Sequence, residues 1–439
     1  MKIREKDLVL ARKCSYSMNC HETQLNNNVI IVGSSGCGKT RSIVSPNIRK
    51  AYGSYIISDP KGNLYEQHCD FLRRQGYKVK IIDFVHPDKS NHYNPFNYIH
   101  SVQDVKTVAH MLAFEAGEND SLDPFWRRSG ELALIALIGY VWNMANYDEK
   151  NIATVYELLT AVEFRENDDE FRDAVDLLFD EYKEEFGEDT FFDAYKNFKS
   201  NCGRTGMCIK NEAVSRIGAF VCPELNALLQ YDDINIGSIG EDKTAVFVIV
   251  SDTDRTMDSL ANLFFTQAIH VLCRTADEGY DGSLPIHTRF IMDDFATNVK
   301  IGEFPRMISS FRSREISSMI IVQAESQLKS LYGYDAETII TNCDSYVYLG
   351  GSDVDTARNV ATRCNKRLRQ ILYMPIGSVW VFRRGSKPVY TRQNAPFVEE
   401  IKGDYLGDYE LEMEDEEDEE DENYEYDPDQ FFNENDEEE

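Results

Sequence analysis

Short runs of apolar residues recur at regular intervals through the N-terminal part of the chain. The runs at 29–32, 55–58 and 79–84 lie about 25 residues apart, and polar segments that suit helices separate them. Continuous apolar runs of this length are typical of strands buried on both faces of a sheet. Because strand and helix patterns alternate, the chain is predicted to have an α/β fold with a mainly parallel sheet. An earlier run at 8–11 predicts an edge strand.

Between residues 102 and 231 the apolar positions follow helical spacing, with almost no strand signal. Helices are predicted over 125–138, with Phe125 and Trp126 buried, and over 155–161, 171–182 and 212–229. Strand patterns return at 243–250, 288–295, 319–323, 345–349 and 378–383, with a long helix over 258–274. The pattern therefore predicts an α/β part at 1–101, an inserted all-α domain at 102–235, a second α/β part at 236–402 and a tail at 403–439.

Composition places the chain among soluble globular proteins, with one segment apart. Of its 439 residues 42% are hydrophobic and 28% are charged. The net charge is −30, but 21 acidic residues and no Lys or Arg lie within 404–439, which leaves −9 for residues 1–403. Self-repulsion predicts that this acidic tail is disordered. Because the body is mildly acidic, any contact with nucleic acid has to come from a local basic patch.

Two basic runs are candidates for contact with a nucleic-acid backbone. They are Arg73, Arg74, Lys78 and Lys80, and the cluster Arg363, Lys366, Arg367 and Arg369. Tracking of a single strand needs a cationic groove, often with aromatic side chains on which bases stack. Neither run is interleaved with aromatic residues, so a solvated helix face is the favoured interpretation of both.

Cysteine usage and hydropathy predict a cytoplasmic chain without a transmembrane segment. The ten cysteines form no C-x-x-C pair, which indicates reduced thiols rather than a disulfide framework or a zinc site. No apolar segment of a secretory signal follows Met1. The longest uncharged apolar run, at 132–147, has 16 residues and includes Asn143 and Asn146. A spanning helix needs about 20 apolar residues, so a buried core helix is predicted there.

The apolar run at 29–32 leads directly into a phosphate-loop motif, G-x-x-x-x-G-K-[ST], at 33–40. Its glycines allow the backbone to turn and to point N–H groups at the oxygens of a bound triphosphate. Lys39 is predicted to contact the β- and γ-phosphates, and the Thr40 hydroxyl to coordinate Mg²⁺. The predicted nucleotide-binding residues are Gly33, Ser34, Ser35, Gly36, Cys37, Gly38, Lys39, Thr40 and Arg41. The alternative is an ordinary glycine-rich turn between a strand and a helix.

Further candidates lie at the ends of later strands. The apolar run 290–292 ends in two acids, as a Walker B strand does, so Asp293 is predicted to hold Mg²⁺ and Asp294 to orient the attacking water. The alternative is a solvated strand end. Gln323 ends the following strand and is predicted to sense the γ-phosphate, or else to cap the next helix. Arg312 and Arg314 are candidates for an arginine finger from a neighbouring subunit, or form a solvated helix face.

These motifs occur in a fixed order that matches a known family. They are the strand and loop at 29–40, Ser58-Asp59-Pro60-Lys61-Gly62, Asn94-Pro95-Phe96, Asp123-Pro124-Phe125-Trp126, Asp293-Asp294-Phe295, and Arg312-Ser313-Arg314 with Gln323 and Gln327-Leu328. Over about residues 8–355 the chain resembles the conjugative coupling proteins, the TraG/TraD-like ATPases of type IV secretion systems, particularly their short forms from Gram-positive mobile elements. The Asp-Pro-Lys-Gly turn is the most specific match, because generic phosphate-loop proteins lack it.

The resemblance implies a RecA-like P-loop NTPase domain with an inserted all-α domain, an ATP and Mg²⁺ site, and a homohexameric ring. It implies ATP-driven delivery of DNA, expected to be single-stranded with a bound relaxase, into a type IV secretion channel whose subunits are further partners. It also strengthens the finger role of Arg312 or Arg314. The relaxase or an accessory protein is expected on the all-α domain or on the tail, where aromatic residues interrupt the acids. Partners are expected to hold the chain at the cytoplasmic face of the membrane.

Three departures from the family pattern leave alternatives open. Asp294 stands where the family usually has Glu, and the shorter side chain predicts slow hydrolysis. The N-terminal transmembrane helices usual in the family are missing, so the chain is expected to be soluble, docked to a membrane partner, or truncated. The region after Gly351 is abbreviated. One alternative function is a nucleotide-binding docking scaffold with weak hydrolysis. Another is a double-stranded DNA pump of the chromosome-segregation type, which leaves the Asp-Pro-Lys-Gly turn unexplained.

Overall fold

The computed structural model describes residues 7–113, 124–165, 171–201, 203–251, 253–295 and 300–394. Its centre is a nine-stranded sheet in the order β11-β10-β9-β3-β8-β7-β4-β6-β5. From β9 to β5 the neighbours in this order are parallel, and β10 and β11 extend the sheet by antiparallel pairing. The strands are β3 (Val29–Val32), β4 (Ser54–Ser58), β5 (Lys78–Asp83), β6 (Thr244–Ile249), β7 (Thr288–Met292), β8 (Ile316–Val322), β9 (Ser345–Tyr348), β10 (Ser378–Arg383) and β11 (Val389–Arg392). The predicted α/β fold with a mainly parallel sheet is confirmed.

Both faces of the sheet are buried, which explains the continuous apolar runs. Ile30 and Val32 of β3 enter the core that holds the apolar residues of α11, whereas Val29 and Ile31 enter the core that holds Ile48 of α2. Alternate residues of one strand thus fill two cores, so a polar residue at either set of positions would be buried. Outside the insertion the helices are α1 (Cys20–Thr23), α2 (Ser45–Ile48), α3 (Asn63–Arg74), α11 (Asp258–Arg274), α13 (Phe304–Met307), α14 (Glu325–Tyr332), α15 (Asp335–Thr341), α16 (Val354–Cys364) and α17 (Leu368–Leu372).

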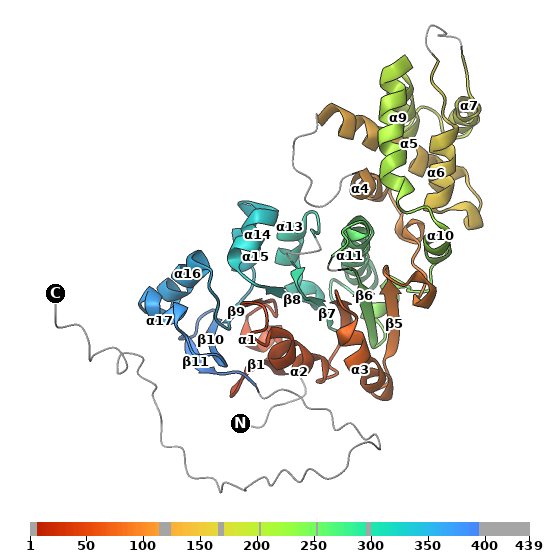
Figure 1. The fold of residues 1–439 in the computed structure, drawn as a ribbon. Helices are drawn as coiled ribbons and strands as arrows, with labels where there is room; N and C mark the ends of the chain where they lie inside the picture. Colours follow the sequence, from red (N-terminus) through yellow and green to blue (C-terminus); the bar gives the residue numbers. More distant parts are fainter. Residues whose placement is uncertain are drawn as a thin grey trace, which may run out of the picture.

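The chain between β5 and β6 forms helices and, in the described residues of this stretch, no strand. Figure 1 shows α5, α6, α7 and α9 grouped apart from the sheet, with α4 and α10 between them and the sheet. The helices are α4 (Val102–Ala113), α5 (Pro124–Met144), α6 (Ile152–Ala161), α7 (Ala174–Phe186), α8 (Thr190–Lys199), α9 (Gly203–Gly218) and α10 (Pro223–Leu229).

Two expectations for these helices are wrong. Phe125 is 44% exposed, because it lies in the first turn of α5, before the fully buried stretch that begins at Ala133. The predicted helix over 212–229 is two helices, since Pro223 lacks a backbone N–H and begins α10 instead of continuing α9.

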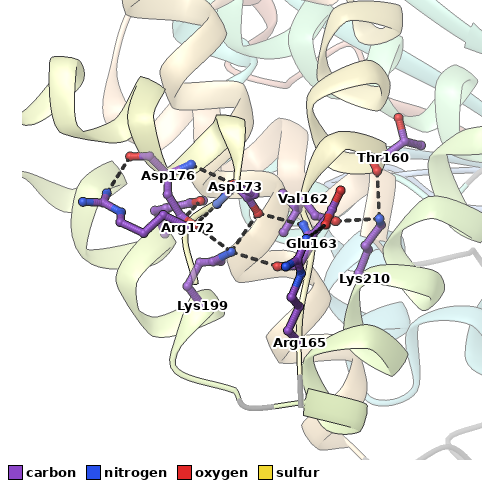
Figure 2. A network of polar contacts seen from close by, with 10 residues as sticks. Thr160, Val162, Glu163, Arg165, Arg172, Asp173, Asp176, Lys199 and Lys210 are labelled. Atoms are coloured by element: carbon purple, nitrogen blue, oxygen red, sulfur yellow. Dashed lines mark hydrogen bonds and ion pairs between the residues drawn. The ribbon is translucent and has the colours of Figure 1, made fainter. Parts of the chain in front are cut away.

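Two lysines bind residues at the end of α6 and at the start of α7 (Figure 2). The Lys199 ammonium lies 2.8 Å from Asp173 and 3.1 Å from Asp176, and it donates to the Glu163 carbonyl at 3.0 Å. Lys210 donates to the carbonyls of Thr160 and Val162 at 2.8 and 2.6 Å, where α6 ends. These contacts pair buried acids and satisfy carbonyls that a helix end leaves open, so the insertion is fixed by its own residues.

The apolar run at 8–11 lies in β1 (Asp7–Ala11), which pairs with β2 (Cys14–Ser17) in a separate two-stranded sheet instead of edging the main sheet. Lys13 lies in the tight turn between them with a φ of +63°. The chain reverses direction at this turn, so β1 pairs with the strand that follows it. Leu8 and Leu10 still pack into the core under the main sheet. Within the described ranges no helix is long and apolar enough to cross a membrane. Residues 403–439 lie outside those ranges, so the predicted disorder of the tail stays a prediction.

Candidate nucleotide-binding site

The phosphate loop follows β3 in the middle of the sheet. The Gly33 N–H donates to the Val322 carbonyl at the end of β8 (3.2 Å), and the Ser34 N–H donates to the Gly350 carbonyl beyond β9 (3.0 Å). Gly36 and Gly38 have φ values of +75° and +91°, which side chains with a Cβ rarely adopt. Both neighbouring strands thus anchor the start of the loop, and the two glycines turn it as the sequence predicts.

The first turn after the loop is widened, because the Ser45 N–H donates to the Thr40 carbonyl five residues earlier. Pro46 follows and has no N–H, and the helical segment from Lys39 to Ile48 consists of this wide turn and the short helix α2. Lys39 stands at the start of the turn and is only 7% exposed. Its ammonium donates to the carbonyls of Gly33 (2.6 Å) and Ser34 (3.1 Å), which holds the charge over the loop.

The two predicted metal ligands meet. The Thr40 hydroxyl donates to a carboxylate oxygen of Asp293 at 2.9 Å, although 253 residues separate them in the chain. Asp293 directly follows β7, and β8 lies between β7 and β3, so the carboxyl ends of these strands meet at one edge. Burial raises the pKa of Asp293 to about 6, and the negative charges of Asp294 and Asp59 add to the rise, while Thr40 and Lys39 oppose it. A site that disfavours its own negative charge would bind a cation readily.

Asp294 lies beside this pair in a strained conformation. Its φ of +49° is in the left-handed region, which costs of order 1 kcal/mol or more for a residue with a Cβ. Its carboxylate lines the cavity next to Asp293 and has no hydrogen bond to any residue that the structure describes. A carboxylate so placed can accept a proton from water or orient the water.

The Asp-Pro-Lys-Gly turn lines the same cavity, which has a volume of about 470 Å³. Asp59 follows β4 and accepts a hydrogen bond from the Tyr65 N–H at 2.8 Å, which fixes the start of α3. Burial raises the pKa of Asp59, while bonds from backbone N–H groups oppose the rise. The turn thus contributes one carboxylate and, through Lys61, one cation to the cavity.

Two further residues of this cavity had no signal in the sequence. The Arg49 Nε donates to His68 Nδ1 at 3.1 Å, so His68 Nε2 carries the proton and donates to the Ser45 hydroxyl at 3.1 Å. His68 lies on α3, and Arg49 lies at the end of α2, after the loop. Only the packing of these two segments brings the two side chains together.

Gln323 lies where the sequence places it, next to the loop. It follows Val322, whose carbonyl accepts the Gly33 N–H. The alternative capping role is not seen, because the N-cap of α14 is Ala324. The backbone N–H of Gln323 is bound by Gln327 Oε1 at 2.9 Å, which fixes the position of the residue after the strand.

Arg312 and Arg314 lie at the other end of β8. That strand spans seven residues, so about 20 Å separates them from the loop of their own chain. Arg314 makes a two-pronged ion pair with Asp277 (2.9 and 2.7 Å), and Arg312 donates to the Cys20 carbonyl at 3.2 Å. Neither arginine reaches the site of its own chain in this arrangement.

The two basic runs mostly make protein contacts. Lys78 pairs with Asp242 at 2.7 Å, and Lys80 donates to the carbonyls of Asp233 and Ile234. The Arg363 guanidinium lies 4.3 Å from the centre of the Tyr346 ring. Lys78 and Lys80 lie on the edge strand β5 and not on a helix, so the expected solvated helix face is wrong for these two residues.

The residues present suit a metal that brings its own oxygen ligands. No group of three or more His, Cys, Asp or Glu side chains in the described ranges could hold a metal by itself. Mg²⁺ at phosphate loops needs only one or two protein oxygens, because phosphate and water oxygens complete its shell. The Thr40 hydroxyl and the Asp293 carboxylate provide such a pair.

A phosphate loop on the central strand of a mainly parallel sheet, with acids after a nearby strand, defines a P-loop protein with a RecA-like fold. Comparison with known proteins gives the family. The model of the family described as "Type IV secretory system Conjugative DNA transfer" matches residues 3–371. The chain therefore belongs to this family, the type IV coupling proteins. No curated protein matches the chain by sequence.

Solved structures share the fold at low sequence identity. The bacterial conjugative coupling protein TrwB, in its unbound monoclinic form, is 16% identical over 90% of this chain and 89% of its own, with a TM-score of 0.66. The plasmid coupling protein TrwB in complex with ADP and Mg²⁺ is 17% identical over 84% and 85%, with a TM-score of 0.61. VirB4 of Thermoanaerobacter pseudethanolicus is 14% identical over 89% and 96%, with a TM-score of 0.54.

Proposed function

We propose that this chain is an ATP-hydrolysing coupling protein that drives DNA and its bound relaxase into a type IV secretion channel. The contact between Thr40 and Asp293 carries the proposal, because it joins the two halves of a Mg²⁺-nucleotide site in a member of the conjugative DNA transfer family. The TrwB structure with ADP and Mg²⁺ supports the choice of ligands. DNA-stimulated release of phosphate by the purified protein tests it, and no release under any DNA condition would contradict it.

Each residue of the site has a distinct role in this proposal. The N–H groups of the loop and the Lys39 ammonium bind the phosphates, and Thr40 with Asp293 holds Mg²⁺, which would neutralise charge on the β- and γ-phosphates. Asp294 orients the attacking water and accepts its proton. The Gln323 amide, beside the start of the loop, hydrogen-bonds the γ-phosphate in this proposal. The acids on the cavity wall would supply negative charge around a bound divalent cation.

We further propose that Arg314 serves the site of a neighbouring subunit in a homohexamer, since it cannot reach its own. In that role it stabilises charge only in the transition state, so Arg314→Ala should lower turnover about 100-fold or more and leave nucleotide affinity within about twofold. Steady-state kinetics and equilibrium binding measure the two. The control is Asp277→Asn, which removes the partner of Arg314 but keeps the arginine. If both variants keep the turnover of the parent, the ion pair is only structural.

The alternative scaffold function rests on Asp294, whose side chain is one methylene shorter than the usual glutamate. If reach limits hydrolysis, Asp294→Glu should raise kcat about tenfold with little change in nucleotide affinity, because a misplacement of about 1 Å can cost up to 100-fold in rate. Strong turnover in the parent would exclude the scaffold. An Asp294→Glu variant no faster than a slow parent would favour it, and Asp294→Asn should be slower than either.

The partners follow from the same proposal. DNA, the channel subunits and a relaxase or accessory protein are expected to bind at the cytoplasmic face of the membrane, the last through the inserted helices or the acidic tail. The tail's many acids would attract a basic partner, with the interspersed tyrosines as anchors. A pull-down in which removal of residues 404–439 leaves relaxase capture unchanged would contradict the role of the tail.

A further inference from the structure

The last two described residues of the chain both bind the phosphate loop region. The Gln393 side-chain Nε2 donates to the Cys37 carbonyl at 2.8 Å, and the Asn394 side-chain Nδ2 donates to the Ser42 carbonyl at 3.0 Å. Gln393 is itself held, because its backbone N–H donates to the Gly377 carbonyl at 2.8 Å. Two amides from the C-terminal end of the sheet therefore close on a loop that lies more than 350 residues earlier in the chain.

The bond to Cys37 fixes a peptide that is central to phosphate binding. Because a peptide is planar and trans, the Cys37 carbonyl and the Gly38 N–H point in opposite directions. With the carbonyl held from outside by Gln393, the N–H is aimed at the inside of the loop, where it can meet a phosphate oxygen. Gln393 also packs tightly, since a Cβ at Gly38 would lie 2.9 Å from its Oε1.

The bond to Ser42 acts on the next part of the site. Ser42 lies in the widened turn that begins at Thr40 and is buried at 3% exposure. A bond to its carbonyl therefore steadies the turn that presents the Thr40 hydroxyl to Asp293. The two amides together hold both ends of the segment that would contact phosphate and metal.

A short edge strand directly precedes these two amides. β11 is an edge strand of four residues that pairs with β10 alone in the main sheet. Its residues are half-buried or exposed, although Val389 and Tyr390 pack against the two cores and the Arg392 carbonyl accepts the Arg12 N–H at 3.0 Å. It lies beyond residue 371, where the match to the family model ends, so the contacts of Gln393 and Asn394 fall outside the stretch that the family model describes.

We propose that Gln393 and Asn394 are positioning residues for nucleotide binding, and that they couple the phosphate loop to the C-terminal segment. The inference rests on the proposed nucleotide function and adds the element that sets the geometry of the loop. Since coupling is reciprocal, bound nucleotide favours the seated strand, and a force that draws the following residues away weakens nucleotide binding. A basic partner bound to the acids beyond residue 403 would act through this connection.

Binding of a fluorescent ATP analogue with Mg²⁺ to the full chain tests the proposal. Loss of one neutral hydrogen bond changes an equilibrium about fivefold, so Gln393→Ala and Asn394→Ala should each weaken binding by about that factor. Gln393→Glu should weaken it about tenfold or more, because a carboxylate cannot donate to Cys37 and repels the phosphates. The control is Lys387→Ala, which removes an exposed side chain from the turn before β11 and should bind the analogue as the parent does. Equal affinity of parent, Gln393→Ala and Gln393→Glu would overturn the proposal.

A second measurement needs no variant. In the parent, ADP with Mg²⁺ should slow amide hydrogen exchange at residues 389–394 as well as in the loop. Slowing in the loop alone would overturn the coupling while leaving the nucleotide site intact. If the parent binds no nucleotide at all, the proposed function and this inference both fail. If it binds nucleotide without slower exchange at residues 389–394, only this inference fails.

Discussion

Replacement of Lys39 by alanine should abolish the ATPase while leaving the fold intact. We expect turnover to fall about 100-fold or more and nucleotide affinity about tenfold or more, because charge-assisted bonds to phosphate are worth about 1.5–3 kcal/mol each and strengthen in the transition state. The ammonium is held over the loop by the Gly33 and Ser34 carbonyls, and no other lysine makes these contacts in the described residues. Phosphate release and binding of a fluorescent analogue measure the two effects.

The control for this variant is Lys387→Ala, which removes an exposed lysine from the turn between β10 and β11. It should keep the turnover of the parent and unfold within about 2 °C of it. Lys39→Ala should unfold up to about 5 °C lower, because it leaves the Gly33 and Ser34 carbonyls without their donor. Lys39→Arg should not rescue activity, since a planar guanidinium does not match a compact ammonium. A Lys39→Ala variant as active as the parent would show that hydrolysis occurs elsewhere.

Local patterns were enough to predict the centre of the molecule. The continuous apolar run at 29–32 predicts a strand buried on both faces, and β3 is such a strand between β8 and β9. The motif at 33–40 forms a loop with positive φ at Gly36 and Gly38. These features depend on residues close together in the chain, and the physical requirements of a strand followed by a tight turn leave few alternatives.

The site residues that could not be predicted from the sequence are brought together by contacts between distant segments. Gln393 reaches Cys37 because β11 is added to the far edge of the sheet, and β11 has no continuous apolar run from which to predict it, since it ends in Thr391 and Arg392. His68 lines the cavity because α3 packs beside the segment after the loop.

Replacement of Asp293 by asparagine should stabilise the protein without metal and inactivate it with metal. The pKa of Asp293 is raised from 3.8 to about 6, so the folded state favours the protonated form. The stability that this provides is fully present below pH 3.8 and is lost as the pH rises through 6. At pH 7 the loss is up to about 3 kcal/mol, from about 2 pKa units at about 1.4 kcal/mol each. Asparagine stays neutral and avoids the loss.

Urea unfolding at several pH values, without Mg²⁺, measures this effect. The free energy of unfolding of the parent should fall relative to Asp293→Asn between pH 4 and pH 7, whereas Asp88→Asn, at an exposed site, should follow the parent. In the presence of ADP, added Mg²⁺ should then stabilise the parent further and not Asp293→Asn, because bound ligand adds stability only where it binds the folded state. Phosphate release by Asp293→Asn should be about 100-fold or more below the parent.

If the stability of the parent relative to the variant is the same at every pH, the raised pKa of Asp293 is contradicted. A variant that gains as much stability as the parent when Mg²⁺ is added to ADP would contradict the role of Asp293 as a metal ligand. The same buried charge that costs the empty site its stability is what would make that site bind Mg²⁺.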